Sequence, residues 1–128
     1  MRVAVSEAEF EAMVRDALDA VPDEFIDQLE NVAISVEDYP DRDDLIAVGL
    51  DPETDFDDLL GLYVGYPKID QGHWDLVMPD KISIYRHALC DHASDLEDLA
   101  TQVKKTVLHE LGHYFGLSDE RLGELGWH

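Results

Sequence analysis

The sequence predicts one α+β domain, in which helices pack on a small mixed sheet and one of the helices is long. Apolar residues recur at helical spacing near both ends of the chain and alternate at strand spacing between them. No repeat and no linker divides the 128 residues, a length that suits one hydrophobic core and is too short for two. We therefore expect residues 1–128 to form a single domain.

The first expected helix covers residues 6–20. Ser6 and Glu9 have the spacing of a capping box, and an apolar side chain then follows every three or four residues. Pro22 suits the first turn of a short second helix over residues 23–29.

The middle of the chain alternates between short apolar segments and polar loops. Strands are expected over residues 32–37, 59–66 and 82–85. Residues 41–48 predict one or two helical turns, and the segments 51–55 and 68–80 predict exposed loops because they contain Pro, Gly and Asp.

The longest expected helix covers residues 94–115 and ends at Gly116. A projection at about 100° per residue places an apolar stripe on one side of this helix, formed by Leu96, Ala100, Val103, Val107, Leu108, Leu111 and Phe115. Leu99 falls outside the stripe, whereas Lys104 falls within it and would have to extend its ammonium past the helix to reach water.

The side of this helix away from the stripe carries His109 and His113, which are one turn apart. Two imidazoles so placed can bind one zinc ion. Glu110 lies at the boundary of the two sides, where its carboxylate can accept a proton from a zinc-activated water. The pattern predicts a Zn²⁺-dependent hydrolase with these two histidines as ligands and Glu110 as the general base.

A third ligand is expected shortly after the helix. Gly116 can adopt a left-handed conformation and turn the chain sharply. Asp119 follows after three residues, a reach of at most about 10 Å, and is the best candidate. Glu120, Glu124 and His128 are also within reach and stay open as alternatives.

The segment from His109 to Asp119, His-Glu-x-x-His-x-x-Gly-x-x-Asp, resembles the extended zincin signature in its variant with Asp in place of the third His. With its small size and the lead-up at residues 62–63 and 79–85, the chain resembles the small bacterial zincin-like metallopeptidases, or minimal zincins, over about residues 20–126. The resemblance implies a zincin-type fold with the motif on a long helix, and zinc bound by the two histidines and Asp119.

One feature departs from the larger relatives of this group. Metzincins place a methionine-containing turn beneath the metal, but no Met follows Asp119 here, and Met78 precedes the helix. The floor of the site is therefore expected to come from other apolar residues, namely Leu117, Leu122, Leu125 or Trp127. The short chain after the motif predicts shallow substrate pockets on that side.

Other chemically capable residues have weaker signals. His73, His87 and His92 are expected to be exposed histidines of loops or strand ends, because none has a partner at the spacing of the motif. Tyr85 and Arg86 are candidates to stabilise an oxyanion, although Tyr63 and Tyr85 fit sheet packing equally well.

Two further features are expected to be structural. Cys90 stands alone in the sequence and is expected to be a small buried hydrophobe. The acidic runs 41–44 and 55–58 lack the pattern of a calcium loop and are expected to be solvated.

Charge limits the possible partners. Nine Lys plus Arg against thirty Asp plus Glu give a net charge of −21, which disfavours a phosphate backbone or an anionic membrane surface. We expect no nucleic-acid or membrane partner, and the single cysteine and the absence of a signal sequence suit the cytoplasm. Much of the acidity is expected to serve solubility; acidic loops beside the cleft would favour basic peptides.

These observations favour a zinc-dependent peptidase that acts on a peptide or protein substrate. Two alternatives remain. One is a zinc-stabilised adaptor without catalysis, which the small size favours. The other is a zinc-dependent endoribonuclease, but those resemble His-Gly-x-x-His-x-x-Gly-x-Asp-His and lack a glutamate at the position of Glu110.

Overall fold

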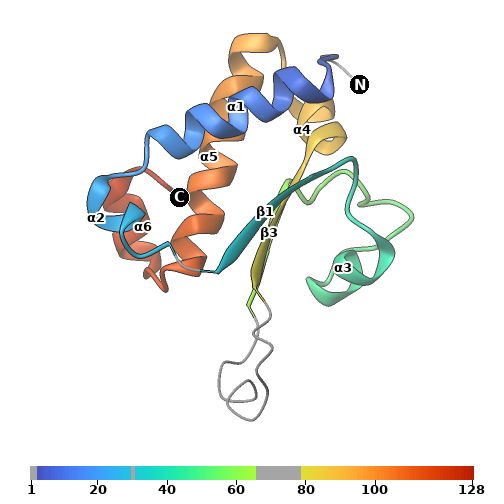
Figure 1. Ribbon diagram of the computed structural model, residues 1–128. Helices are drawn as coiled ribbons and strands as arrows, with labels where there is room; N and C mark the ends of the chain where they lie inside the picture. Colours follow the sequence, from blue (N-terminus) through green and yellow to red (C-terminus); the bar gives the residue numbers. More distant parts are fainter. Residues whose placement is uncertain (1–2, 30, 66–78) are drawn as a thin grey trace.

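The computed structural model describes residues 3–29, 31–65 and 79–128 (Figure 1). Their order along the chain is α1 (Glu7–Asp19), α2 (Asp23–Ile26), β1 (Val32–Glu37), α3 (Arg42–Ala47), β2 (Gly61–Val64), β3 (Asp80–Tyr85), α4 (Arg86–His92), α5 (Leu96–Tyr114) and α6 (Asp119–Leu125). This arrangement confirms the α+β class with one long helix. None of the described helices is long and apolar enough to cross a membrane.

The three described strands form a mixed sheet in the order β1-β3-β2. β1 pairs with β3 in parallel, with Ile34 opposite Ile82, and β2 pairs with β3 antiparallel, with Tyr63 opposite Ile82. β3 is the central strand, and its residues Ile82 and Ile84 have no exposed surface. The free edge of β2 is therefore one of the two outer edges of the sheet.

Helix α5 positions the motif because it packs between the sheet and α1 (Figure 1). Its inner side chains Val103, Val107 and Leu111 are fully buried in one core with Phe10 of α1 and Ile84 of β3.

Local capping explains where the helices begin. The main-chain N–H of Glu9 donates to Ser6 Oγ at 3.1 Å, and the N–H of Ser6 donates to Glu9 Oε1 at 3.2 Å, which confirms the expected capping box. Asp95 begins α5, because its Oδ1 accepts the N–H of Asp98 at 2.8 Å.

Two helices were not expected from the sequence. α4 follows β3 directly, and its N-cap Tyr85 makes no side-chain capping bond, so the usual start signal is absent. α6 does carry such signals: Ser118 Oγ accepts the N–H of Arg121 at 3.1 Å, and Gly126 ends the helix with φ of 75°.

The strand boundaries also differ from the expectation. β2 covers residues 61–64 rather than 59–66, and β3 begins at Asp80, which was expected in the loop 68–80. Residues 66–78, which include His73 and Met78, lie outside the described part of the chain.

The buried side of α5 differs from the projection in its first turns. Leu99 is fully buried, whereas Leu96 is 55% exposed and Ala100 is also exposed. The reason is the unexpected α4, which packs against α5 and joins Leu99 in the same core. Lys104 is exposed, which agrees with the expectation that its charged ammonium reaches water.

The acidic run at residues 41–44 caps α3. Asp41 Oδ1 accepts the N–H of Asp44 at 3.0 Å, and the Tyr85 hydroxyl donates to Asp44 Oδ2 at 3.4 Å. Burial, and next the charge of Asp41, raise the pKa of Asp44 above its ordinary value of 3.8.

Asp44→Asn is expected to stabilise the protein at neutral pH. A raised pKa in the folded state means that ionised Asp44 opposes folding above that pKa, whereas below its ordinary value of 3.8 the carboxyl is protonated in both states. Urea unfolding at pH about 7 and about 3.5 checks this, since the gain should disappear at the lower pH. Asp43→Asn removes an exposed charge from the same helix and should change stability by less than about 0.5 kcal/mol. A gain from Asp44→Asn that is equal at both pH values would contradict this interpretation.

Candidate metal centre

The two motif histidines lie together on the last turns of α5. His109 Nε2 and His113 Nε2 are 2.9 Å apart, and the ring centroids are 4.6 Å apart. Two imidazole nitrogens on one tetrahedral zinc would be roughly 3.3 Å apart, given Zn–N distances of about 2.0–2.1 Å. The pair therefore needs only a slight separation to hold zinc, and its donor set fits this metal.

A main-chain carbonyl fixes the proton on His109. His109 Nδ1 is 3.0 Å from the carbonyl oxygen of Trp127, which can only accept, so Nδ1 carries the proton. Nε2 of a neutral His109 then keeps its lone pair and can accept a hydrogen bond from His113 Nε2. A carbonyl in this role is a common outer partner of zinc-binding histidines.

Trp127 is held in place by the end of α6. Its N–H donates to the carbonyl of Leu122 at 2.8 Å, after Gly126 has turned the chain with φ of 75°. The indole is buried, and its centroid lies 5.4 Å from that of Phe25 in α2. The sequence analysis expected Trp127 in the floor of the site but did not predict the hydrogen bond between its carbonyl and His109. The available signal was Gly126, which follows the apolar positions of α6 and can end a helix.

Glu110 lies between α5 and the sheet. Its carboxylate accepts the main-chain N–H of Tyr63 in β2. Burial raises the pKa of Glu110 above its ordinary value, while the two nearby histidines and this hydrogen bond act in the opposite direction. A raised pKa makes the carboxylate a better proton acceptor.

The edge of β2 that faces away from β3 is the edge that meets Glu110. The N–H of Tyr85 donates to the carbonyl of Leu60 at 3.0 Å, so alternate residues from Leu60 onward bond to β3. The main-chain groups of Gly61 and Tyr63 therefore point outward, as the contact from Tyr63 to Glu110 requires.

Gly61 allows β2 to lie close to helix α5. A Cβ at position 61 would lie 2.7 Å from Thr106 Cγ2 and 3.2 Å from Glu110 Cγ, which is closer than side chains normally pack. The lack of a side chain thus lets β2 lie directly against the motif helix, and no sequence pattern had singled out this glycine.

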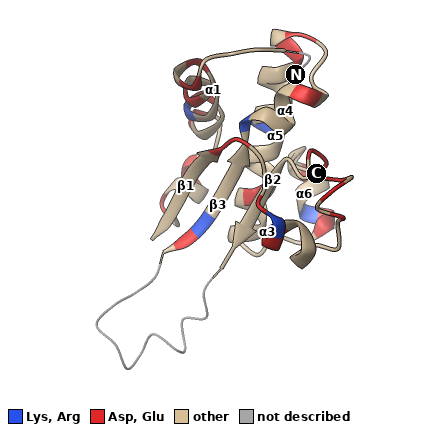
Figure 2. Ribbon diagram, turned by 90° about the vertical axis from the view of Figure 1, so that its right-hand side faces the viewer, with Lys and Arg blue, Asp and Glu red and all other residues tan. Residues whose placement is uncertain are grey.

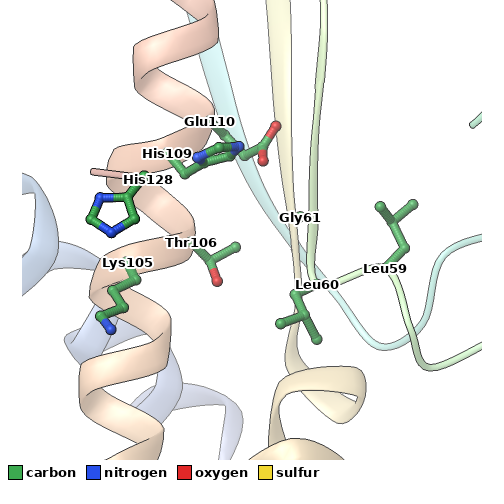
Figure 3. Close-up of a pocket in the computed structure, with 8 residues that line it drawn as sticks. All are labelled: Leu59, Leu60, Gly61, Lys105, Thr106, His109, Glu110 and His128. Carbon is green, nitrogen blue, oxygen red and sulfur yellow. The ribbon is translucent and has the colours of Figure 1, made fainter. Parts of the chain in front are cut away.

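A cavity of about 340 Å³ opens beside these residues (Figure 3). Its lining comes from the chain around the start of β2, from α5 and from the last residue: Leu59, Leu60, Gly61, Lys105, Thr106, His109, Glu110 and His128. In Figure 3, Glu110 and Thr106 point from α5 toward the strand that carries Gly61. Lys105 and His128 lie on the side of α5 that is turned away from this strand. The cavity exposes the expected base and one expected ligand to the same space.

The expected third ligand is not assembled with the imidazole pair. Asp119 is the exposed first residue of α6. Among the described residues, three ligand atoms lie within 4.8 Å of one another only at Asp57, Asp58 and His92, so neither Asp119 nor its alternatives complete such a group with the histidines. The identity of the third ligand stays a prediction.

The alternatives to Asp119 have different surroundings. Glu120 is exposed on α6, and Glu124 Oε2 lies 3.1 Å from Arg121 Nη1 on the same helix. His128 differs from both because it lines the cavity beside His109.

The separate group of Asp57, Asp58 and His92 lies at the surface. His92 Nε2 is 2.7 Å from the main-chain oxygen of Asp57 and 3.8 Å from Asp58 Oδ1. His92 ends α4 and is exposed, which agrees with its expected exposure but not with a loop position.

His87, by contrast, is half-buried in α4, with its ring against Tyr39 at a centroid distance of 5.3 Å. The expectation of an exposed histidine was therefore wrong for this residue, because the unexpected α4 packs it against the chain that follows β1.

The two oxyanion candidates bond elsewhere. Tyr85 is fully buried, and its hydroxyl contacts Asp44. Arg86 Nη1 donates to the carbonyl of Val5 at 3.0 Å, and its Nη2 lies 3.1 Å from Asp38 Oδ1. These side chains connect α4 to neighbouring segments rather than to the cavity.

Cys90 is buried as expected, and Tyr63 packs against α5. Cys90 is buried, which raises the pKa of its thiol. Tyr63 packs its ring 6.0 Å from that of Tyr114, and its hydroxyl donates to Asp80 at 2.7 Å. Burial, and next this hydrogen bond, raise the pKa of Tyr63 to about 12, so its hydroxyl keeps its proton at neutral pH.

α6 and the residues that flank it dock against the part of α5 that carries the motif. Leu122 and Trp127 are buried, and Leu117 and Leu125 are half-buried. A Cβ on Gly112 would overlap Leu122 Cδ2, so the glycine between the two histidines allows α6 to dock against α5.

Gly112→Ala is expected to displace α6, and the overlap with Leu122 should cost about 1–3 kcal/mol of unfolding free energy. Because Trp127 follows α6 directly after its C-cap Gly126, the zinc affinity should also fall. Gly123→Ala is the control, because a Cβ there meets no atom within 4 Å and should stabilise the protein by about 0.5–1 kcal/mol. Denaturant unfolding and zinc titration of both variants check this; wild-type stability and affinity in Gly112→Ala would contradict the docking role.

Comparison with known proteins identifies the family. A family model described as zincin-like metallopeptidase matches residues 29–127, a segment that begins before β1 and includes both motif histidines. A search of curated proteins found no match. The family match supports a function of the metallopeptidase type and implies a zinc cofactor. The chain belongs to the zincin-like metallopeptidase family.

Proposed function

We propose that this protein is a zinc-dependent peptidase in which His109, His113 and Asp119 hold the metal and Glu110 is the general base. The observation that carries the proposal is the imidazole pair, with its Nε2 atoms 2.9 Å apart, beside a cavity that also contains Glu110. Zinc held there supplies a Lewis acid for a carbonyl oxygen and lowers the pKa of a water molecule.

The chain's own groups prepare this chemistry. The Trp127 carbonyl keeps the proton of His109 on Nδ1 and leaves Nε2 free as a ligand. His113 would have to give up its Nε2 proton, or move it to Nδ1, to become the second ligand. The raised pKa of Glu110 suits a group that first accepts a proton and then passes it to the leaving amine.

The β2 edge supports a peptide as the substrate. The outward main-chain groups of Gly61 and Tyr63 lie next to Glu110, and an extended peptide could add to this edge as a further strand. The N–H of Tyr63 donates to Glu110. A substrate carbonyl that took over this N–H would free the carboxylate for proton transfer.

The two alternatives have less support. The net charge of −21 would repel RNA, and an endoribonuclease of the similar motif would not need Glu110. A zinc-stabilised adaptor is favoured by the exposed position of Asp119, away from the imidazole pair. The role of Glu110 separates the adaptor from the peptidase.

Glu110→Gln is expected to abolish hydrolysis of a peptide library while zinc remains bound, because the amide can still accept the Tyr63 N–H but cannot accept a proton. A loss of about a hundredfold or more is expected for a general base. Glu97→Gln, an exposed glutamate in the first turn of the same helix, is the matched control and should keep full activity. Unchanged hydrolysis in Glu110→Gln would contradict the peptidase, and no hydrolysis by any form would favour the adaptor.

The double variant His109→Ala/His113→Ala is expected to lose zinc, measured by elemental analysis after dialysis. His92→Ala removes a histidine from the other ligand group and should retain the metal. Asp119→Ala should weaken zinc binding by more than about tenfold, whereas His128→Ala should not. Zinc retained in the double variant would overturn the site. A larger loss of zinc affinity in His128→Ala than in Asp119→Ala would assign the third ligand to His128.

A further inference from the structure

Lys105 is the feature of the cavity that the proposed function does not use. It lies one turn before His109 on α5 and lines the same 340 Å³ cavity as His109 and Glu110. A neighbouring cavity of about 350 Å³ shares Lys105, Thr106 and Leu60 and continues along the helix to Asp98. Lys105 therefore lies where the two cavities meet.

The charge balance of this region differs from that of the whole molecule. The net charge is −21, and acidic segments are spread over many helices and loops (Figure 2). Within the first cavity, however, Glu110 is the only carboxylate side chain among the described lining residues, and Lys105 is the only lysine or arginine. The charges of these two side chains cancel, so the cavity lacks the excess of negative charge that the molecule has as a whole, and Lys105 is a local positive centre within it.

No ion pair within the described residues engages Lys105. Asp98 lines the second cavity with Lys105, and its carboxylate accepts the N–H of Ser94 and Gln102 Nε2, each at 2.9 Å. These hydrogen bonds, and after them the charge of Lys105, lower the pKa of Asp98, so Lys105 attracts this carboxylate without forming an ion pair with it. The exposed Lys105 ammonium is thus available to a carboxylate from outside the chain.

The spacing between Lys105 and His109 along α5 defines which substrate group could reach Lys105. One helical turn separates Lys105 from His109, a rise of about 5.4–6 Å along α5. An extended peptide advances about 3.3 Å per residue. A group opposite Lys105 would therefore belong to a residue one or two positions from the bond placed beside His109 and Glu110. Leu59 and Leu60 provide an apolar wall for the carbon atoms of that residue.

We propose that Lys105 selects substrates that carry a carboxylate one or two residues from the cleaved bond. The carboxylate belongs either to an Asp or Glu side chain or to the C-terminus of a short peptide. The inference rests on the proposed peptidase function and deepens it. It is opposite to the preference for basic peptides that the overall acidity would favour.

The test compares zinc-loaded wild-type protein with Lys105→Glu and Lys104→Glu. The substrates are amidated peptides of one sequence that carry Glu, Gln or Lys one or two residues to either side of the cleaved bond. We expect the wild type to prefer Glu over Lys by roughly fivefold in kcat/KM at the preferred position, and Lys105→Glu to reverse this order.

Lys104→Glu is the matched control, because it makes the same change of charge one residue away. Lys104 lines a different cavity, with Met13 and Asp16 of α1, and the order of the substrates should not change in this variant. An equal shift in both variants would mean that only the net charge matters and would overturn the proposal. Wild-type protein that cleaves Glu and Lys peptides equally well would also overturn it.

A second substrate pair separates the two sources of the carboxylate. One peptide carries an internal Glu and an amidated end, and the other has no acidic side chain and a free C-terminus. Preferential cleavage of either one, lost in Lys105→Glu, supports recognition by Lys105 and identifies the source.

Binding distinguishes failure of this inference from failure of the proposed function. The same labelled peptides are titrated into zinc-loaded Glu110→Gln protein, with and without Lys105→Glu, and fluorescence anisotropy is recorded. Binding that prefers acidic peptides and depends on Lys105, in a protein whose wild type cleaves nothing, supports the recognition and contradicts the peptidase. Binding without such a preference overturns the role of Lys105 whatever the activity.

Discussion

The hydrogen bond from His109 Nδ1 to the Trp127 carbonyl, 3.0 Å long, is the contact on which the rest of the site depends. It decides which nitrogen of His109 is free to bind a metal, and therefore which atom faces His113. A main-chain carbonyl cannot change its protonation state, so the tautomer is set by the position of α6. That position depends in turn on Gly112, which gives Leu122 its space against α5, and on the tilted ring contact of Trp127 with Phe25. Although it is short, the segment after the motif therefore contacts both His109 and Gly112 of α5.

A second main-chain group holds the other side of α5. The N–H of Tyr63 on the free edge of β2 bonds to Glu110, and Gly61 lets that edge approach the helix. Partners from opposite sides of the helix therefore hold the candidate ligand and the candidate base, and neither partner is a side chain that a substitution would remove. The cavity between them carries a lysine in a molecule with a net charge of −21. Its chemistry follows from this local arrangement rather than from the average charge.

The sequence predicted the parts of the fold that have local signals. The capping box at Ser6, the alternation in β1 and the histidine spacing on α5 each determine a structure within a few residues, and each was found where expected. α4 was missed because Tyr85 makes no side-chain cap, and the buried position of Leu99 was missed because it depends on α4. The contacts of Trp127 and Gly61 with the motif join residues far apart in the chain, which no spacing rule can supply. The roles of Glu110 and Asp119 stay predictions, since they depend on a metal and a substrate.

The most direct test of the central claim is a long-range ¹H–¹⁵N spectrum of the histidine rings, recorded before and after one equivalent of zinc. We predict that Nε2 of both His109 and His113 shifts to the position of a metal-bound nitrogen, while both Nδ1 atoms carry protons. His87 and His92 in α4 should keep their spectra, although His92 belongs to the other group of possible ligands. Zinc that shifts His92 and leaves the motif histidines unchanged would contradict the account.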